Sequence, residues 1–131
     1  MRGDTTYHEF YKLIVENVTA LGHTALCELN SQFGSAIPLT DGQIFKRDIK
    51  WIDKSELLIA EVSGASSGVG FEIAYALYSR KIPVLALANE DAKKVSAMIA
   101  GCNSDLFVYR KYSSKDDIKQ TISRFIKKYS K

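Results

Sequence analysis

The residues best suited to chemistry are two carboxylates, Asp48 and Glu72, and a turn of small residues at 63–68. The turn follows an apolar run at 57–62, which predicts a strand buried on both faces, and it precedes a helical pattern over 69–79. Such a turn lets a ligand approach bare backbone amides at the positive end of the following helix. Because Glu72 stands one helical turn further along, the arrangement suggests a site for a phosphorylated substrate.

Helical geometry places both carboxylates on faces that are otherwise apolar. At about 100° per residue, Asp48 shares its face of a helix over 41–53 with Ile44, Phe45, Trp51 and Ile52. Glu72 shares its face with Val69, Tyr75, Ala76 and Gly68. An unpaired carboxylate on such a face is costly, so either residue alone can be explained by a structural partner such as a basic group. Two of them, one beside a Gly/Ser turn, favour a binding site.

A pair of acids suits the cleavage of an N-glycosidic bond. Departure of the base leaves positive charge on the sugar, and a carboxylate at the anomeric carbon can stabilise that charge or bond to the carbon. The second acid can protonate or hold the leaving base. Hydroxyls, amides and one guanidinium can meet a phosphate dianion, so this chemistry predicts neither a metal nor a cofactor.

The same stretch carries a family resemblance. Three pieces, Asp48-x-x-Trp51, Ala60-Glu61-Val62 and Ser66-x-Gly68-Val69-Gly70-Phe71-Glu72, resemble the signature of the nucleoside 2-deoxyribosyltransferase superfamily. The resemblance is strongest to its hydrolytic branch, the 2'-deoxynucleoside 5'-phosphate N-hydrolases. Residues 95–101 and Arg2-Gly3 resemble two further family segments, so the resemblance runs from about residue 2 to about residue 110.

The resemblance implies roles for individual residues. Glu72 would be the nucleophile, and Asp48 would position Glu72 or the base. The 5'-phosphate would be held by the turn and the first loop, through Ser66, Gly68, Gly70, Arg2 and Gly3. Ser96 would reach the phosphate in the neighbouring subunit, which makes a homodimer part of the expectation.

Alternating helix and strand patterns predict one α/β domain over 1–131. We expect a doubly wound, flavodoxin- or Rossmann-like parallel sheet with helices on both faces. The expected strands are 24–26, 57–62, 83–87 and 106–109, and the expected helices are one ending at Gly22 and others at 41–53, 69–79, 93–100 and 114–129.

The pattern begins with a helix, whereas family members carry a strand and a Tyr/Ser loop ahead of the segment that matches Arg2-Gly3. The usual first central strand is therefore lacking from this sequence. Either the sequence starts downstream of the true start or a central strand has been lost. We favour an incomplete N-terminus, because loss of a central strand would expose two sheet edges.

Composition narrows the remaining classes. The chain of 131 residues has 46% hydrophobic residues and a net charge of +3, which predicts one domain with a core and only a mild charge. The C-terminal lysines lack interleaved aromatic residues, which argues against a nucleic-acid partner. No apolar run reaches membrane length, and Cys27 and Cys102 lack metal-ligand spacing. We expect a soluble cytoplasmic protein with no membrane partner.

These observations together predict an enzyme that hydrolyses 2'-deoxynucleoside 5'-monophosphates to free base and 2-deoxyribose 5-phosphate. Two alternatives stay open: a deoxyribosyltransferase that passes the sugar to a second base, and a non-catalytic nucleotide-binding protein. A dinucleotide-binding oxidoreductase is disfavoured, because no Gly-x-Gly-x-x-Gly motif opens the chain. The sequence does not determine the preferred base.

Overall fold

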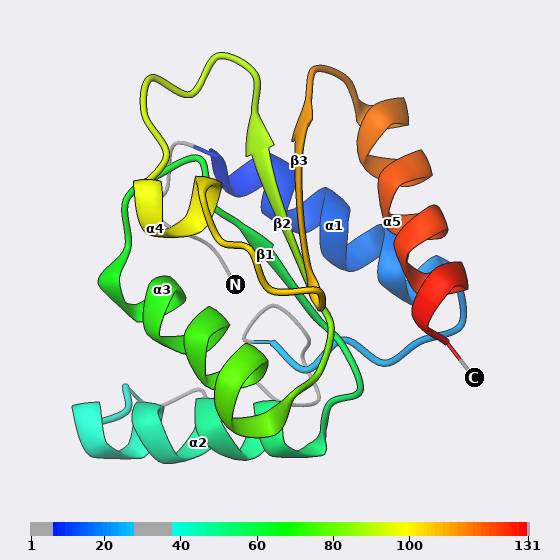
Figure 1. Cartoon of the computed structure of the whole chain (residues 1–131). Helices are drawn as coiled ribbons and strands as arrows, with labels where there is room; N and C mark the ends of the chain where they lie inside the picture. The colour runs from blue at the N-terminus through cyan, green and yellow to red at the C-terminus, as the bar shows by residue number, and fades with distance from the viewer. Residues whose placement is uncertain (1–6, 28–37, 131) are drawn as a thin grey trace.

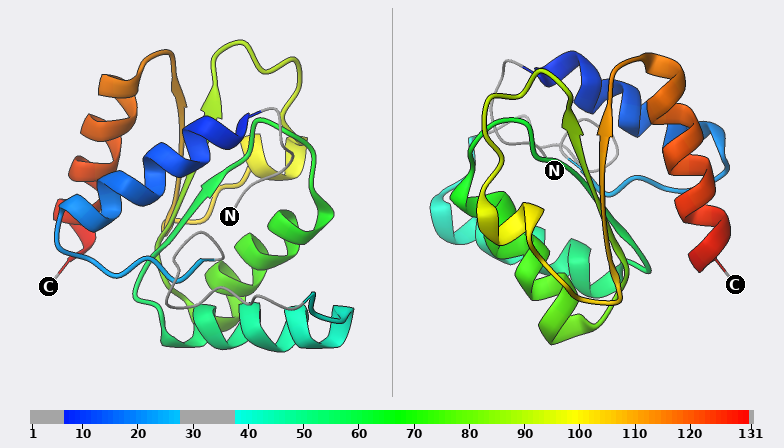
Figure 2. Two further views of the ribbon diagram at one scale, coloured as in Figure 1. Left: turned by 180° about the vertical axis from the view of Figure 1, so that it is seen from behind. Right: turned by 45° about the horizontal axis from the view of Figure 1, so that its top comes forward.

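A parallel sheet forms the centre of the protein. The computed structural model describes residues 7–27 and 38–130. Within them the sheet has three strands, β1 (Leu58–Glu61), β2 (Val84–Asn89) and β3 (Phe107–Tyr112), in the order β1-β2-β3. Both strand pairs are parallel. Helices cover both faces of the sheet (Figures 1 and 2), which confirms the predicted α/β class with a doubly wound arrangement.

The helices follow the predicted order, but two of them differ in extent from the prediction and one predicted strand is missing. They are α1 (His8–Ala20), α2 (Asp41–Lys54), α3 (Ser67–Ala74), its π-helical continuation η2 (Tyr75–Arg80), α4 (Ala97–Ala100) and α5 (Lys115–Tyr129). The helix expected over 69–79 thus starts earlier and changes to π-helix at Tyr75. The helix expected over 93–100 is limited to its last four residues. The strand expected at 24–26 is wrong, since a run of three residues is too short to specify a strand and adopts no regular structure here.

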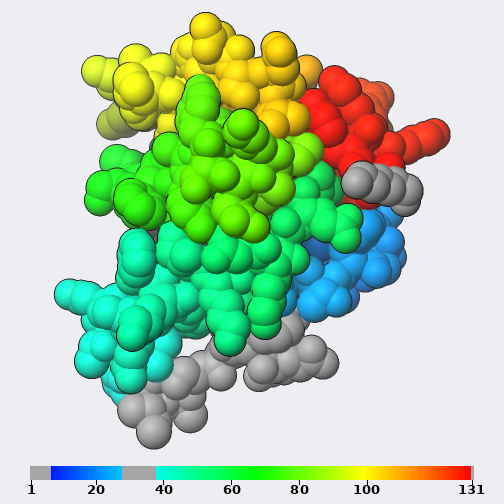
Figure 3. Space-filling view, turned by 60° about the horizontal axis from the view of Figure 1, so that its bottom comes forward, coloured from blue at the N-terminus to red at the C-terminus, as the bar shows by residue number. Residues whose placement is uncertain are grey.

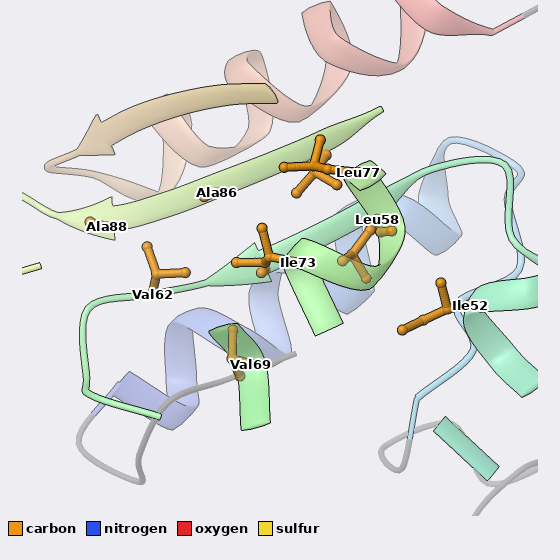
Figure 4. Packing of buried hydrophobic residues seen from close by; sticks show 11 residues of the cluster. Ile52, Leu58, Val62, Val69, Ile73, Leu77, Ala86 and Ala88 are labelled. Atoms are coloured by element: carbon orange, nitrogen blue, oxygen red, sulfur yellow. The ribbon is translucent and has the colours of Figure 1, made fainter. Parts of the chain in front are cut away.

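Strand β2 explains why the sheet needs helices on both sides. All six of its residues are buried, as a continuous apolar run predicts for a parallel strand. Val84, Ala86 and Ala88 pack against one set of helices, through Ile52 of α2, Val69 and Ile73 of α3, and Leu77 of η2 (Figure 4). Leu85 and Leu87 point to the other face, where they pack against α1 and α5 through Ile14, Ile118, Ile122 and Phe125.

Parallel strands bring their carboxyl ends to one edge of the sheet, and this edge carries the candidate site. The turn after β1 leads into α3, and the segment after β2 leads into α4 (Figure 1). Ligands of open α/β sheets bind at this edge. The topology therefore brings the Ser66 turn and Ser96 to the same side of the molecule.

That residues 1–131 form one domain remains a prediction, because residues 1–6, 28–37 and 131 lie outside the described residues. Within residues 7–27 and 38–130, no helix is both long enough and apolar enough to cross a bilayer.

Candidate active site

A hollow of about 530 Å³ lies between the turn after β1 and the segment that leads into α4. Its polar lining comes from three serines and one lysine: Ser66, Ser67, Ser96 and Lys94. The rest of the lining is backbone and small or apolar side chains, namely Val62, Gly64, Ala65, Val69 and Ile99. A hollow with hydroxyls, an ammonium group and a helix start along its wall suits an anion.

Ser66 is the N-cap of α3. Its Oγ accepts a hydrogen bond from the Val69 amide at 3.2 Å, which satisfies one of the helix's first free N–H groups. A hydroxyl that accepts from the backbone still has its proton to donate. The capping role and a phosphate-binding role for Ser66 are therefore compatible.

Ser96 plays the same local role at α4. Its Oγ accepts from the Met98 amide at 3.2 Å, and its side chain is exposed. Ser66 and Ser96, 30 residues apart in the sequence, line the same hollow within one chain. The expectation that Ser96 instead completes the site of a neighbouring subunit remains a prediction.

Glu72 lies on α3, one turn beyond Val69 on the same helix face. Val69 lines the hollow, whereas Glu72 is not among the residues that line it. The Glu72 side chain is half-buried, and its Oε2 atom is shielded from solvent. A carboxylate one helical turn from a hollow that suits an anion can meet a sugar whose phosphate occupies that hollow.

Asp48 lies on α2 at the level of Glu72. Phe45 of α2 contacts Phe71 of α3 edge-on at 6.0 Å, and further along the helices the Tyr75 hydroxyl donates to Asp53 at 2.6 Å. Along α2 the two contacts lie on either side of Asp48, and along the neighbouring helix they lie on either side of Glu72. The Asp48 side chain is 19% exposed and accepts from Arg47 Nε at 2.9 Å.

The apolar helix face expected around Asp48 is buried only in part, and the basic partner that was left open is present. The N-terminal half of that helix face, with Ile44 and Phe45, is exposed, and a guanidinium pairs with the acid. Only Trp51 and Ile52, in the C-terminal half, are buried. The role of Asp48 in positioning Glu72 or the base stays a prediction.

The fold has room for a side chain at Gly68 and at Gly70. A Cβ built on Gly68 would meet only the Ser66 Oγ, at 3.8 Å, and one on Gly70 would meet nothing within 4 Å. Both lie in the first turns of α3 rather than in the lining of the hollow. Arg2 and Gly3, the other predicted phosphate ligands, lie outside the described residues.

Lys94 is a candidate phosphate ligand that was not predicted from the sequence. It lines the hollow together with Ser66 and Ser67. In the sequence it is one of two consecutive lysines, Lys93 and Lys94, and nothing in that pair distinguishes a ligand from a solvated side chain. Only the fold, which brings the chain after β2 beside the turn after β1, reveals the difference.

A buried polar network at the same sheet edge was missed as well. The Glu61 carboxylate, 1% exposed, accepts from the Ser63 amide at 2.7 Å, from Ser63 Oγ at 2.7 Å and from the Tyr112 hydroxyl at 2.6 Å. Ser63 Oγ in turn accepts from the Asn89 amide at 2.6 Å. Burial and the hydrogen bond to Glu61 raise the pKa of Tyr112, so its hydroxyl remains a donor at neutral pH. A charged residue between Ala60 and Val62 in a strand was the available signal.

A second hollow lies away from these residues. It has a volume of about 350 Å³ and adjoins α1, residues 23–27 and the amino end of β1. None of the predicted site residues lines it. Because open α/β sheets bind ligands at the carboxyl ends of their strands, we place the site at the other hollow. No group of three or more His, Cys, Asp or Glu residues within the described ranges is arranged to hold a metal ion.

The fold places a hollow lined by hydroxyls and one ammonium group at the carboxyl edge of the sheet of a parallel α/β domain, with a carboxylate further along the adjoining helix. The family model described as nucleoside 2-deoxyribosyltransferase matches residues 3–116. The chain belongs to this family.

Relatives and a solved structure agree with this assignment. A Methanosarcina mazei protein with the provisional name 2'-deoxynucleoside 5'-phosphate N-hydrolase 1 is 37% identical over 133 residues, covering 97% of this chain and 80% of its own length. A Tetraodon nigroviridis 5-hydroxymethyl-dUMP N-hydrolase is 32% identical over 121 residues, covering 91% of this chain and 84% of its own length. The structure of a Clostridium botulinum CMP N-glycosidase superimposes with a TM-score of 0.67 at 16% identity, covering 95% of this chain and 97% of that one, which shows a shared fold.

Proposed function

We propose that this protein is an enzyme that hydrolyses the N-glycosidic bond of 2'-deoxynucleoside 5'-monophosphates, giving free base and 2-deoxyribose 5-phosphate. The observation that carries the proposal is the hollow with Ser66, Ser67 and Lys94 on its wall and Glu72 one helical turn along α3 from Val69 of that wall. The names of the relatives, which describe hydrolases of deoxynucleotides, support the same reaction.

In this reaction the Glu72 carboxylate forms a bond to C1' of the deoxyribose while the bond from C1' to the base nitrogen breaks. The base leaves with the electron pair and takes up a proton, which Asp48 can help to deliver or hold in place. Water then attacks C1' of the sugar–Glu72 ester, releasing 2-deoxyribose 5-phosphate and restoring the carboxylate. The phosphate stays bound throughout and fixes the sugar relative to Glu72.

The proposal predicts a strong preference for the phosphorylated substrate. We expect kcat/KM for a deoxynucleoside 5'-monophosphate to exceed that for the unphosphorylated nucleoside by about tenfold or more, because each charge-assisted hydrogen bond to the phosphate adds binding energy. Chromatography of base and sugar products measures both rates. Equal rates would contradict a phosphate site, and base exchange faster than hydrolysis would identify a transferase. Binding without turnover would identify a nucleotide-binding protein.

A second prediction tests the cation of the hollow. Lys94→Ala should raise KM for the monophosphate about tenfold and leave kcat nearly unchanged, because it removes one charge-assisted contact to a group that does not react. The matched control is Lys93→Ala, which removes the same charge from an exposed neighbour outside the lining. Equal KM values in both variants would show that Lys94 contributes only to the general charge of the protein.

We further propose a homodimer in which Ser96 serves the neighbouring site. Support comes from large apolar side chains left exposed on α2, α3, η2 and α4, including Phe45 (55%), Phe71 and Tyr78, and Met98 (85%), which lies two residues from Ser96. Figure 3 shows α2, η2 and the region of α4 on one face of the molecule. Several large apolar side chains exposed on one face favour an interaction surface there.

Mixing two impaired chains tests the exchange of Ser96. Glu72→Gln and Ser96→Ala protein should together recover activity, because a mixed dimer contains one site with Glu72 from one chain and Ser96 from the other. Rates are measured before and after mixing, and light scattering gives the mass of each sample. A monomer at micromolar concentration, or a mixture no more active than the Ser96→Ala chain in it, would assign Ser96 to its own hollow.

The remaining expectations are part of the same proposal. We propose a cytoplasmic location with neither nucleic acid nor membrane as a partner. The net charge of +3 is mild for a nucleic-acid-binding protein, and the two cysteines lack metal-ligand spacing.

A further inference from the structure

We propose that Glu61, Ser63 and Tyr112 are positioning residues for the anion-binding turn, and that they set how tightly the substrate phosphate is held. This inference rests on the proposed function, because it assumes that the turn binds the 5'-phosphate. None of the three residues lines the hollow, and none belongs to the predicted site.

The network fixes one residue of the turn at two atoms. Ser63 donates its amide to Glu61 Oε1 and its hydroxyl to Glu61 Oε2, while its Oγ also accepts from the Asn89 amide. Ser63 is thereby tied to its own strand and to β2. Its two chain neighbours, Val62 and Gly64, both line the hollow. The position of Ser63 therefore determines where the wall of the hollow begins.

Tyr112 closes the network from the far strand. Its hydroxyl donates to Glu61 Oε2, across 51 residues of sequence, and its side chain is 1% exposed. Tyr112 is the register partner of Asn89, so β2 and β3 both contribute to holding the carboxylate at their carboxyl ends. Three donors around one carboxylate restrict its rotation and hence the position of Ser63.

A buried carboxylate is not an effective way to stabilise a fold. Removing a charged side chain from water is costly, and apolar side chains of similar volume often replace buried charges without loss of stability. Both faces of the sheet around Glu61 already have apolar cores. We therefore assign Glu61 a geometric role, which is to fix the position of the turn where the turn contacts the ligand.

The network also separates the amides of the turn by role. The Ser63 amide is taken by Glu61, whereas α3 starts four residues later, at Ser67, where the first N–H groups of a helix lack intrahelical partners. A phosphate is thus received by the later amides and hydroxyls, on a turn whose first residue is held by Glu61 and by the Asn89 amide.

Tyr112→Phe tests the inference, because it deletes one oxygen and leaves the ring in the core. We expect KM for a deoxynucleoside 5'-monophosphate to rise about tenfold with kcat changed less than about twofold, since one hydrogen bond to a charged group is lost at a distance from the reacting atoms. The kcat/KM for the unphosphorylated nucleoside should not change, so the preference for the phosphorylated substrate falls. Inorganic phosphate, used as a competitive inhibitor, should bind more weakly by the same factor.

Tyr109→Phe is the matched control, because it removes a hydroxyl from the same strand, outside the network. Glu61→Gln is the second variant and should lower the same preference further. Equal losses for both substrates in Tyr112→Phe, or loss of its folded circular dichroism signal, would overturn the inference, since either result would show a network that supports the fold. An unchanged preference in a folded variant would overturn it too.

Failure of the proposed function is visible separately, because wild-type protein would then show no preference for the monophosphate.

Discussion

Glu72→Gln is expected to leave the protein folded and to lower turnover by about three orders of magnitude or more, because an amide cannot form the covalent bond to C1'. Glutamine keeps the shape of the side chain and its capacity for hydrogen bonds, so the packing of α3 on the sheet should not change. The proposed phosphate contacts lie at the start of α3 and at Lys94, which line the hollow, so binding of the nucleotide should survive. Single-turnover rates, a binding titration and circular dichroism on one preparation measure the three properties.

The matched control is Glu16→Gln, which makes the same change at an exposed position of α1. It should leave turnover and binding as they are. If Glu72→Gln retained wild-type turnover, the covalent route would be excluded. If it unfolded the protein, the half-buried carboxylate would be structural. The acid that stabilises the positive charge on the sugar would then be Asp48 or another residue.

The sequence predicted those features of the fold that depend on local pattern. The continuous apolar run of β1 and β2 indicates strands covered on both faces, and this is how the two cores divide the side chains of β2. The helix predicted over 114–129 is present as α5, and the Ser114 side chain caps its start by accepting a hydrogen bond from the Asp117 amide. The small-residue turn before Val69 correctly marks the junction of a strand with a helix.

The sequence could not predict features that depend on distant parts of the chain. Lys94 lines the hollow and Lys93 does not, and this difference follows from the path of the chain between β2 and α4. The partners of Glu61 are two residues and 51 residues away, and no periodicity connects them. The helical wheel placed Asp48 on an apolar face but could not show that its neighbour Arg47 pairs with it, or that Arg47 also lies 4.5 Å from the Trp51 ring.

The switch to π-helix at Tyr75 is a further feature beyond sequence pattern. It lies just after Glu72, and the chain leaves it through Lys81, whose φ is 55°. The Ile82 amide bonds to the Ala76 carbonyl, so the wide turn is closed before β2 begins. Irregular helix of this type occurs frequently at functional sites. At its first residue the Tyr75 hydroxyl donates to Asp53 of α2, and this contact joins the helix of Asp48 to the helical segment that follows Glu72.

Gly68→Ala is expected to separate the requirements of the fold from those of the ligand. Gly68 occupies the second helical position of α3, and an added Cβ would meet only the Ser66 Oγ, at 3.8 Å. Alanine should therefore stabilise the protein by about 0.5 kcal/mol, because it reduces the freedom of the unfolded chain and favours the helix. Side-chain carbons of a helix tilt toward its N-terminus, so the new methyl group would stand beside the Ser66 hydroxyl, which belongs to the wall of the hollow proposed to receive the phosphate.

The methyl group should raise KM for the monophosphate by about tenfold to a hundredfold, the loss expected when a charged group can no longer reach one or two donors. Gly42→Ala is the matched control. Gly42 has the same position in α2, after the capping Thr40, and its added Cβ would meet nothing within 4 Å. It should give a similar gain in stability and unchanged kinetics. Thermal unfolding and steady-state rates of the two variants measure both quantities. If Gly68→Ala binds the monophosphate as tightly as wild type, the phosphate does not approach the start of α3, and the anion site must be placed elsewhere in the hollow.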